Sequence, residues 1–295
     1  MASATSDSTN DGAEWDCPAL FPEPEGDFRS HAGPGDRVAL PLPACYVFGS
    51  HAVCLTTDPH AAIATKVWRG ALILARALLA ERELVEERRV LELGCGVGLC
   101  GILASLLGAS HVVLSDCSWE GLKYVLLNVN CARSPVKVPL KGSRSWGTAG
   151  DPVQIRWHLW ETDEPRSPGR GPPRHWSNEA RCTFGEEGEP PRLEASARFD
   201  VVIGADVLYF HQQVAPLAAT VGARLAQGGV GLLTLVVRKR DVYISFIDKC
   251  EEFGLAVVSN TAVDVDPLDE HYLEAQAVET ASAQEVRLLR LARAA

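Results

Sequence analysis

Short apolar segments alternate with amphipathic ones along most of the chain, and the two kinds differ in period. Continuous apolar runs predict buried strands at 90–93, 111–115, 153–160, 199–203, 230–237, 255–258 and 286–291. Apolar residues at helical spacing predict helices at 63–79, 99–107, 122–129, 214–225 and 242–253. Strands and helices in alternation are typical of a parallel sheet covered on both faces, which predicts a doubly wound α/β fold.

Three segments fall outside this alternation. Residues 1–39 are rich in Ser, Asp, Glu, Pro and Gly, and we expect a disordered acidic leader there. Residues 46–55 have strand composition on both sides of Gly49-Ser50, which predicts a short hairpin. Residues 162–198 are crowded with Pro, Gly, Arg and Glu, and we expect a long, mostly disordered insertion. The remaining pattern predicts one domain over residues 40–295.

The charge of the chain is concentrated at its start. The formal net charge is −10, and residues 1–36 carry eight acids and one base, so −7 of it lies in the leader. No basic stripe is present, which argues against a nucleic-acid partner. An acidic leader could recruit a basic protein, although a plain solvating role is the commoner one for such a segment.

The nine cysteines are scattered and form no C-x-x-C pair. The N-terminus does not resemble a signal peptide, and no apolar run reaches the roughly 18 residues that a membrane span needs. These features predict free, mostly buried thiols in a reducing compartment, hence a cytoplasmic protein without a membrane partner, the nucleus remaining open. The histidines show no metal-ligand spacing, so we expect no metal.

A glycine-rich turn carries the strongest chemical signal in the sequence. Glu92, Gly94, Gly96 and Gly98 follow a predicted strand and open a predicted helix. Glycine allows the chain to turn sharply and allows a ligand to approach the backbone closely. Asp116 ends the next strand, 18 residues after Gly98. An acid at that place can accept hydrogen bonds from both hydroxyls of a ribose.

Two ligands fit this turn. Residues 96–101 also read G-x-G-x-x-G, the pattern of a dinucleotide site, which likewise expects an acid about 20 residues further on. An acid at Glu92, directly before the glycines, suits a ligand with a cationic amino-acid part and would repel a pyrophosphate. We therefore favour S-adenosylmethionine over a nicotinamide dinucleotide, with a tight turn that binds no ligand as the third interpretation.

The segments LELGCGVGLCGI, DVVIGADVLYF and the upstream KVWRGALILARAL resemble the methyltransferase family 16 of protein-lysine methyltransferases over roughly residues 45–160 and 199–260. The resemblance implies a Rossmann-like sheet of seven strands, mostly parallel, with an antiparallel strand near the C-terminus. It also implies S-adenosylmethionine as the cofactor and a lysine of another protein as the acceptor, handled by a monomeric enzyme. A histidine or arginine acceptor, and a catalytically inactive adaptor, remain as alternatives.

The resemblance implies a role for each matching position. The positions expected to bind the cofactor are Trp68, Glu92, Gly94, Cys95, Gly96, Gly98, Asp116, Trp160 and Ala205. Asp206 and Tyr209 match the D/E-x-x-Y motif and are expected at the substrate lysine channel. Glu161 follows Trp160 where the family usually has glycine.

The residues taken alone leave other roles open for four of these side chains. Asp206 could cap the following helix, and Tyr209 could be a packed aromatic. Trp68 lies on the apolar face of the predicted helix 63–79 and could belong to the core, and Trp160 is similarly ambiguous. In a methyltransferase, Asp206 would instead orient the lone pair of the substrate amine, which must be neutral to attack although its free pKa is about 10.4. Tyr209 would form part of the channel wall.

Overall fold

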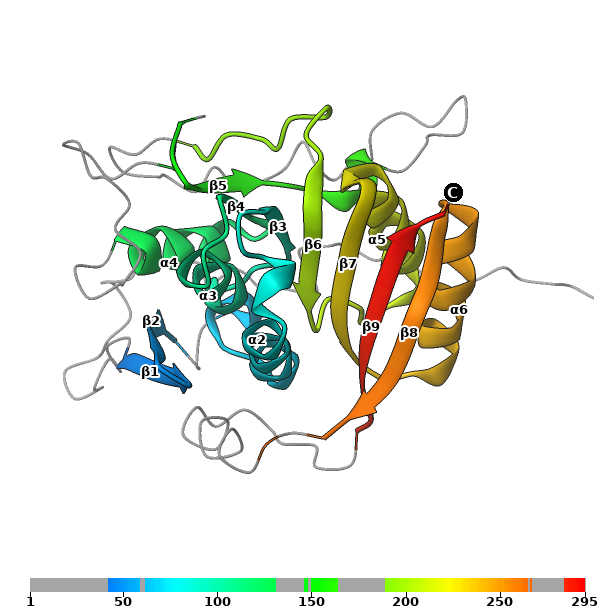
Figure 1. The fold of residues 1–295 in the computed structure, drawn as a ribbon, viewed down its shortest axis with the longest axis horizontal. Coiled ribbons are helices and arrows are strands. Elements are labelled where there is room, and N and C mark those ends of the chain that lie inside the picture. The colour runs from blue at the N-terminus through cyan, green and yellow to red at the C-terminus, as the bar shows by residue number, and fades with distance from the viewer. Residues whose placement is uncertain are drawn as a thin grey trace, which may run out of the picture.

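The computed structural model describes residues 42–58, 62–130, 146–147, 150–163, 189–264, 266 and 284–294. Seven strands form one sheet in the order β5-β4-β3-β6-β7-β9-β8 (Figure 1). They are β3 (Arg89–Leu93), β4 (His111–Asp116), β5 (Val153–Trp157), β6 (Phe199–Ala205), β7 (Leu225–Val236), β8 (Leu255–Val263) and β9 (Val286–Arg293). The pairs from β5 to β7 are parallel, whereas β9 is antiparallel to both of its neighbours. The predicted fold class is therefore confirmed.

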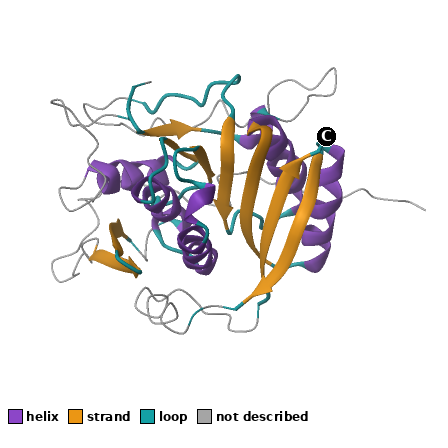
Figure 2. Cartoon of the chain, in the orientation of Figure 1, coloured by secondary structure: helices purple, strands orange, loops and turns teal. Residues whose placement is uncertain are grey.

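Helices cover both faces of this sheet (Figure 2). Helices α2 (Arg69–Ala80), α3 (Leu99–Leu106) and α4 (Trp119–Asn130) share one hydrophobic cluster with one face. Helices α5 (His211–Arg224) and α6 (Arg240–Glu252) share a second cluster with the other face. Three short 3-10 turns complete the helical elements: η1 (Ile63–Thr65), η2 (Arg82–Leu84) and η3 (Trp160–Thr162). No helix in the described part of the chain has both the length and the apolar character to cross a bilayer.

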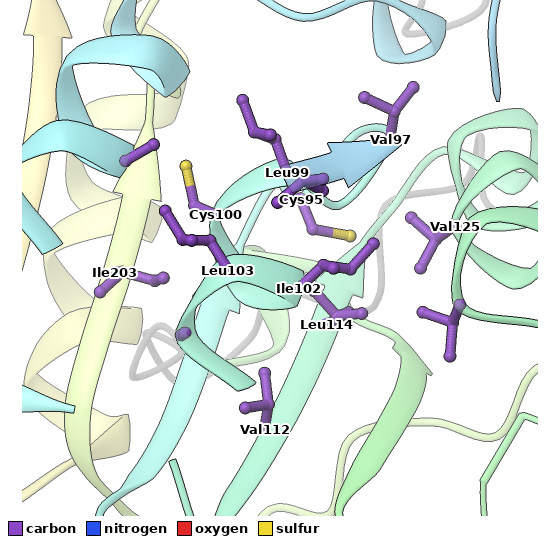
Figure 3. Packing of buried hydrophobic residues seen from close by; sticks show 14 of the residues in the cluster. Cys95, Val97, Leu99, Cys100, Ile102, Leu103, Val112, Leu114, Val125 and Ile203 are labelled. Carbon is purple, nitrogen blue, oxygen red and sulfur yellow. The ribbon is translucent and has the colours of Figure 1, made fainter. Parts of the chain in front are cut away.

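The central strands are buried on both sides, which explains their continuous apolar runs. Along β3, Val90 belongs to one cluster while Leu91 and Leu93 belong to the other. Figure 3 shows side chains of α3, among them Ile102 and Leu103, packed beside the strands. Each fully buried side chain of this kind stabilises the fold by roughly 1.5–3 kcal/mol. The sheet is thus a rigid base for the loops at its strand ends.

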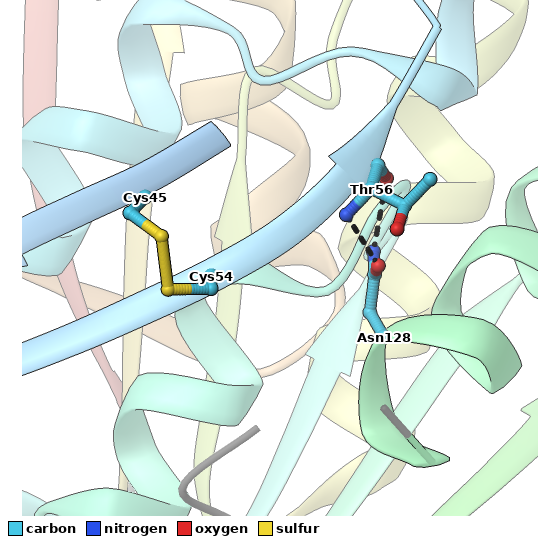
Figure 4. Close-up of a disulfide and its surroundings, with 4 residues drawn as sticks. All are labelled: Cys45, Cys54, Thr56 and Asn128. Atoms are coloured by element: carbon cyan, nitrogen blue, oxygen red, sulfur yellow. Dashed lines mark hydrogen bonds between the residues drawn. A yellow bond between two sulfur atoms is a disulfide. The ribbon is translucent and has the colours of Figure 1, made fainter. Parts of the chain in front are cut away.

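The predicted hairpin is present and is longer than expected. Strands β1 (Leu42–Phe48) and β2 (His51–Thr57) pair antiparallel around a turn at Gly49, whose φ is 57°. Cys45 and Cys54 face each other across this hairpin and form a disulfide, with Cα atoms 4.0 Å apart (Figure 4). The prediction of free thiols is therefore wrong for this pair.

The other cysteines in the described part of the chain agree with the prediction, since none of them is in a disulfide. Cys95, Cys100 and Cys250 are buried, and Cys117 is exposed. Three further cysteines, at positions 17, 131 and 182, lie outside the described residues, as does the leader expected at 1–39.

Several predicted element boundaries need correction. Strand β7 begins at Leu225 instead of residue 230, and β8 continues to Val263 instead of ending at residue 258. The helix expected from residue 63 begins at Arg69, because residues 63–65 form η1 and Trp68 has the extended angles φ −101° and ψ 158°. The hydroxyl of Thr65 donates to the carbonyls of Asp58 and Ala62, which holds the turn before the helix. Trp68 is thus the N-cap residue and does not lie on a helical face. The strand expected over 153–160 ends at Trp157.

The expectation of disorder over 162–198 is wrong at both ends of that segment, while residues 164–188 lie outside the described part. At one end, Asp163 is buried against Arg224 of α5, which donates to both of its carboxylate oxygens at 2.7 and 2.5 Å. At the other end, Trp157 bonds the backbone of Pro191 and Leu193, so the chain runs along the edge of β5. These contacts fix both ends of the segment to the domain.

Candidate functional site

The predicted site residues gather where the parallel strands end. The order of the sheet reverses at β3, which lies between β4 and β6. In open α/β sheets, ligands bind at the carboxyl ends of the strands at such a switch point. The residues after β3, the end of β4 and the end of β6 all lie at this edge.

The glycine-rich turn after β3 requires glycine at each of its three positions. Gly94, Gly96 and Gly98 have φ values of 60°, 51° and 89°, in the left-handed region that disfavours side chains. A Cβ atom on Gly94 would lie 2.8 Å from Cγ1 of Val207. A Cβ atom on Gly96 would lie 3.1 Å from the carbonyl oxygen of Ala64. The turn therefore packs against two other segments of the site.

Asp116 at the end of β4 is bonded directly to this turn. Its Oδ2 accepts from the backbone N–H of Gly96 at 2.9 Å, and its Oδ1 accepts from that of Ser118 at 2.8 Å. Burial raises the pKa of Asp116, while the backbone hydrogen bonds act in the opposite direction. The predicted proximity of the acid and the glycines is confirmed.

Glu92, which the family motifs place at the cofactor, has a structural partner in the protein. Its Oε2 accepts from the backbone N–H of Gly101 in α3 at 2.8 Å, and the residue is only 3% exposed. Burial raises its pKa to about 8; the Gly101 hydrogen bond opposes this shift and the charge of Asp116 adds to it. A Cβ atom on Gly101 would lie 2.6 Å from that Oε2 and would also meet Leu114. Close packing of helix on strand thus accounts for the last glycine of the G-x-G-x-x-G pattern.

The two predicted aromatic residues differ in their contacts. Trp160 lies in η3, and its Cζ2 is 3.6 Å from the place of a Cβ on Gly94. Trp68 donates its indole N–H to the carbonyl of Ile63 at 2.9 Å, and the ammonium of Lys66 lies 5.7 Å from its ring centroid. Trp160 is therefore next to the glycines, whereas Trp68 is fixed to η1.

Trp157, and not Trp160, is the tryptophan that ends β5. Its ring stacks on Trp119 with centroids 5.9 Å apart, and its indole N–H donates to the carbonyl of Cys117.

Two further predicted positions, Cys95 and Ala205, lie close to the strand ends. Cys95 is buried, and burial raises the pKa of its thiol. Ala205 ends β6 and pairs with Thr234 of β7.

Asp206 does not cap a helix. Helix α5 has Phe210 as its N-cap residue, and Oε1 of Gln213 accepts from the backbone N–H groups of Tyr209 and Phe210. Asp206 itself has a φ of 55°, and its N–H donates to the carbonyl of Thr234 at 2.7 Å. Non-glycine residues in this region are uncommon and concentrate at functional sites. Its side chain is therefore positioned by backbone strain and not by helix capping.

Arg238 is a member of the site that the sequence analysis missed. Its guanidinium donates to both carboxylate oxygens of Asp206, at 2.5 and 2.7 Å. The same guanidinium carbon lies 4.6 Å from the ring centroid of Tyr209. Burial is the main cause that raises the pKa of Tyr209, and the charge of Asp206 raises it further. The charge of Arg238 opposes this rise. The phenol consequently remains protonated at neutral pH.

The predicted residues thus form two adjoining groups. The first contains the glycine turn, Asp116 and Trp160; the second contains Asp206 and Tyr209, together with Arg238. Val207 connects them, because its side chain lies against Gly94 of the first group. Within the described residues, no set of three His, Cys, Asp or Glu side chains is arranged to hold a metal ion.

The strand order, the glycine turn after β3 and the carboxylate ending β4 define a class I methyltransferase fold. A family model described as lysine methyltransferase matches residues 48–148. The protein N-lysine methyltransferase METTL21A of Danio rerio is 31% identical over 194 residues, which are 65% of this chain and 70% of that protein. The chain therefore belongs to the lysine methyltransferase family, as the motifs predict.

Other relatives are longer than the matched region. The protein-lysine N-methyltransferase EFM3 of Chaetomium thermophilum is 29% identical over 199 residues, 65% of this chain and 48% of that protein. The protein N-terminal and lysine N-methyltransferase EFM7 of Cryptococcus neoformans is 25% identical over 224 residues, 70% of this chain and 58% of that protein. The chain thus spans about half the length of these two curated relatives.

Proposed function

We propose that this chain transfers a methyl group from S-adenosylmethionine to a lysine side chain of another protein. The observation that carries the proposal is the pairing of Asp116 with the glycine turn, beside the Asp206 and Tyr209 pair at the end of β6. The names of METTL21A, EFM3 and EFM7, all lysine methyltransferases, support the same acceptor.

The residues of the first group fit the cofactor. Gly94 and Gly96 carry no side chain, so a ligand that reaches the turn would meet its backbone. Asp116 would accept hydrogen bonds from the ribose hydroxyls, and Trp160 with Ala205 would lie beside the adenine. Cys95 and Trp68 complete the cofactor set proposed from the family motifs. Glu92 would act indirectly, by fixing the start of α3 through Gly101.

The second group would handle the acceptor. S-adenosylmethionine, when bound, supplies a methyl group already activated on a sulfonium. The protein must then align a neutral amine with that methyl group and keep water out, and alignment alone lowers barriers by about 7–11 kcal/mol in model systems. Asp206 would accept a hydrogen bond from the amine and orient its lone pair. Tyr209, held protonated by its raised pKa, would form the channel wall and would not act as a base.

Binding of the cofactor tests the first half of the proposal. Calorimetry on the full chain should show S-adenosylmethionine binding, strong loss of affinity in Asp116→Ala, and no binding of nicotinamide dinucleotides. Asp248→Ala, which removes an exposed acid from α6, serves as the matched control. A wild-type chain without affinity for S-adenosylmethionine would refute the proposal.

Transfer tests the second half. Wild type, Asp206→Asn and Asp248→Ala are incubated with methyl-labelled S-adenosylmethionine and a cell extract, and the labelled residue is identified by mass spectrometry. We expect labelled lysine with wild type and the control, and little label with Asp206→Asn. Label on histidine or arginine would show that this residue, and not lysine, is the acceptor. Binding of S-adenosylmethionine without any label would favour an inactive adaptor. The cytoplasmic location, the monomeric state and the single domain over 40–295 stay predictions.

A further inference from the structure

Arg238 contacts both predicted members of the proposed acceptor group, Asp206 and Tyr209. It follows β7, the strand next to β6, and reaches across to Asp206. The side chain of Asp206 is 1% exposed, whereas that of Arg238 is 26% exposed. In this ion pair the acid therefore lies inside the site and the base lies at its rim.

The geometry of this pair leaves the Asp206 carboxylate able to accept a further hydrogen bond. A carboxylate offers about four lone pairs, and a bidentate guanidinium uses one on each oxygen. Arg238 also lies over the Tyr209 ring, so its own position is fixed from a second side. The carboxylate is thus held still while part of its acceptor capacity remains.

Charge decides what such a carboxylate does to an amine. An unpaired carboxylate within about 4–6 Å stabilises an ammonium and raises its pKa, commonly by 1–3 units. A protonated amine has no lone pair and cannot attack a methyl group. A carboxylate whose charge is balanced by a guanidinium can orient the amine without this effect.

We propose that Arg238 is a positioning residue: it fixes the Asp206 carboxylate and balances its charge, so that Asp206 orients the substrate lysine without keeping it protonated. This inference rests on the proposed function. The other titratable groups around the pair are Tyr209 and, from β4, Asp116, whose charge reaches Tyr209. Helix α2 packs against Asp206 through Gly70 and begins at Arg69.

The test is the pH dependence of methyl transfer from labelled S-adenosylmethionine to the proteins of a cell extract. The variants are Arg238→Met, which removes the charge, and Arg238→Lys, which keeps the charge without the bidentate fork. Arg240→Met removes an exposed arginine two residues away and is the control. Arg238→Gln is a second neutral variant in case the first does not fold. Thermal melts and S-adenosylmethionine affinity establish that each variant is intact.

The transfer rate should rise with pH as the amine loses its proton. In Arg238→Met and Arg238→Gln we expect this rise to move to higher pH by about 1–3 units. The rate near pH 7 should fall at least tenfold and recover in alkaline buffer. Arg238→Lys keeps the charge, so its rise should stay at the wild-type pH, but the lost fork should lower its rate at every pH. Arg240→Met should keep the wild-type profile. Damage to the fold would lower the rate at every pH and would not be rescued by alkali.

Two results would overturn the inference. A neutral variant with an unshifted profile would remove the charge-balancing role of Arg238. Faster transfer at pH 7 would mean that Arg238 obstructs the substrate. No labelling by wild type would instead refute the proposed function itself, so the two failures are distinguishable.

Discussion

Replacing Glu92 with glutamine should change how the stability of the protein depends on pH. Glu92 is 3% exposed and accepts from the N–H of Gly101, a contact that the amide oxygen of glutamine can reproduce. Burial raises the pKa of this carboxyl from 4.5 to about 8 in the folded protein. In the unfolded chain the same group is exposed and ionises near its ordinary value.

The size of the effect follows from this difference. Between pH 4.5 and about 8 the folded state holds a proton that the unfolded state has lost, so stability falls as pH rises. The slope for one such group is about 1.4 kcal/mol per pH unit, and the whole window amounts to about 5 kcal/mol. Glutamine does not titrate, so Glu92→Gln should lack this contribution. At pH 8 the variant should be more stable than wild type by several kcal/mol, and near pH 5 the two should be similar.

Urea unfolding of the full chain at pH 5.5, 6.5, 7.5 and 8.5 would measure this difference. Asp116, whose pKa is also raised by burial, contributes the same slope to both proteins and cancels in the comparison. Glu83→Gln, which removes an exposed carboxylate of η2, should follow wild type and serves as the control. Parallel stability curves for wild type and Glu92→Gln would show that Glu92 is ionised in the folded protein and would refute the reasoning.

Three further outcomes follow from buried polar contacts. Arg224→Met leaves Asp163 buried without its cationic partner and should cost about 3–5 kcal/mol in urea unfolding, part of which Asp163→Leu should restore in the double variant. Burial lowers the pKa of His158, so the unfolded state takes up the proton first; stability should fall as pH drops below about 6.5, and His158→Gln should flatten that part of the thermal-melt profile. Asn128→Ala breaks the amide's bonds to Thr56 of β2 (Figure 4) and its bond to the carbonyl of Val97 in the glycine turn. The substitution should cost about 1–3 kcal/mol and weaken S-adenosylmethionine binding in calorimetry.

The sheet and its glycine turn could be predicted because their signals are local. A strand such as β6 is apolar along its length since it is buried on both faces. Gly94 and Gly96 are required by backbone angles that few other residues adopt. Asp116 is the last residue of β4, so its place at the shared edge comes from the parallel topology. Each of these features depends on a few neighbouring residues.

Features that depend on distant partners could not be read from the sequence. Arg238 follows an apolar strand, and nothing near it indicates a carboxylate 32 positions earlier. The polar composition of 162–198 suggested disorder, yet Arg224 binds Asp163 and also donates to the carbonyl of Glu194. Both ends of the segment are thus ordered by one buried arginine of α5, whose role is invisible in its local sequence.

The hairpin disulfide had a signal that was overlooked. The turn at Gly49-Ser50 sets the register of the two strands, so that Phe48 faces His51 and, three pairs further on, Cys45 faces Cys54. The number and spacing of all nine cysteines do not indicate this pairing, whereas the turn implies it. Register from a tight turn was therefore a better guide here than the overall number and spacing of cysteines.

The contact of Val207 with Gly94 bears on how the two halves of the site depend on each other. The segment that carries Asp206 and Tyr209 packs directly on the backbone of the cofactor turn, with no side chain at Gly94 to separate them. Asp206 is also tied through its N–H to β7, the strand that leads to Arg238. A shift of the turn must therefore displace Val207, and with it the carboxylate of Asp206. Under the proposed function, donor binding and acceptor alignment would consequently be set by one continuous packed unit.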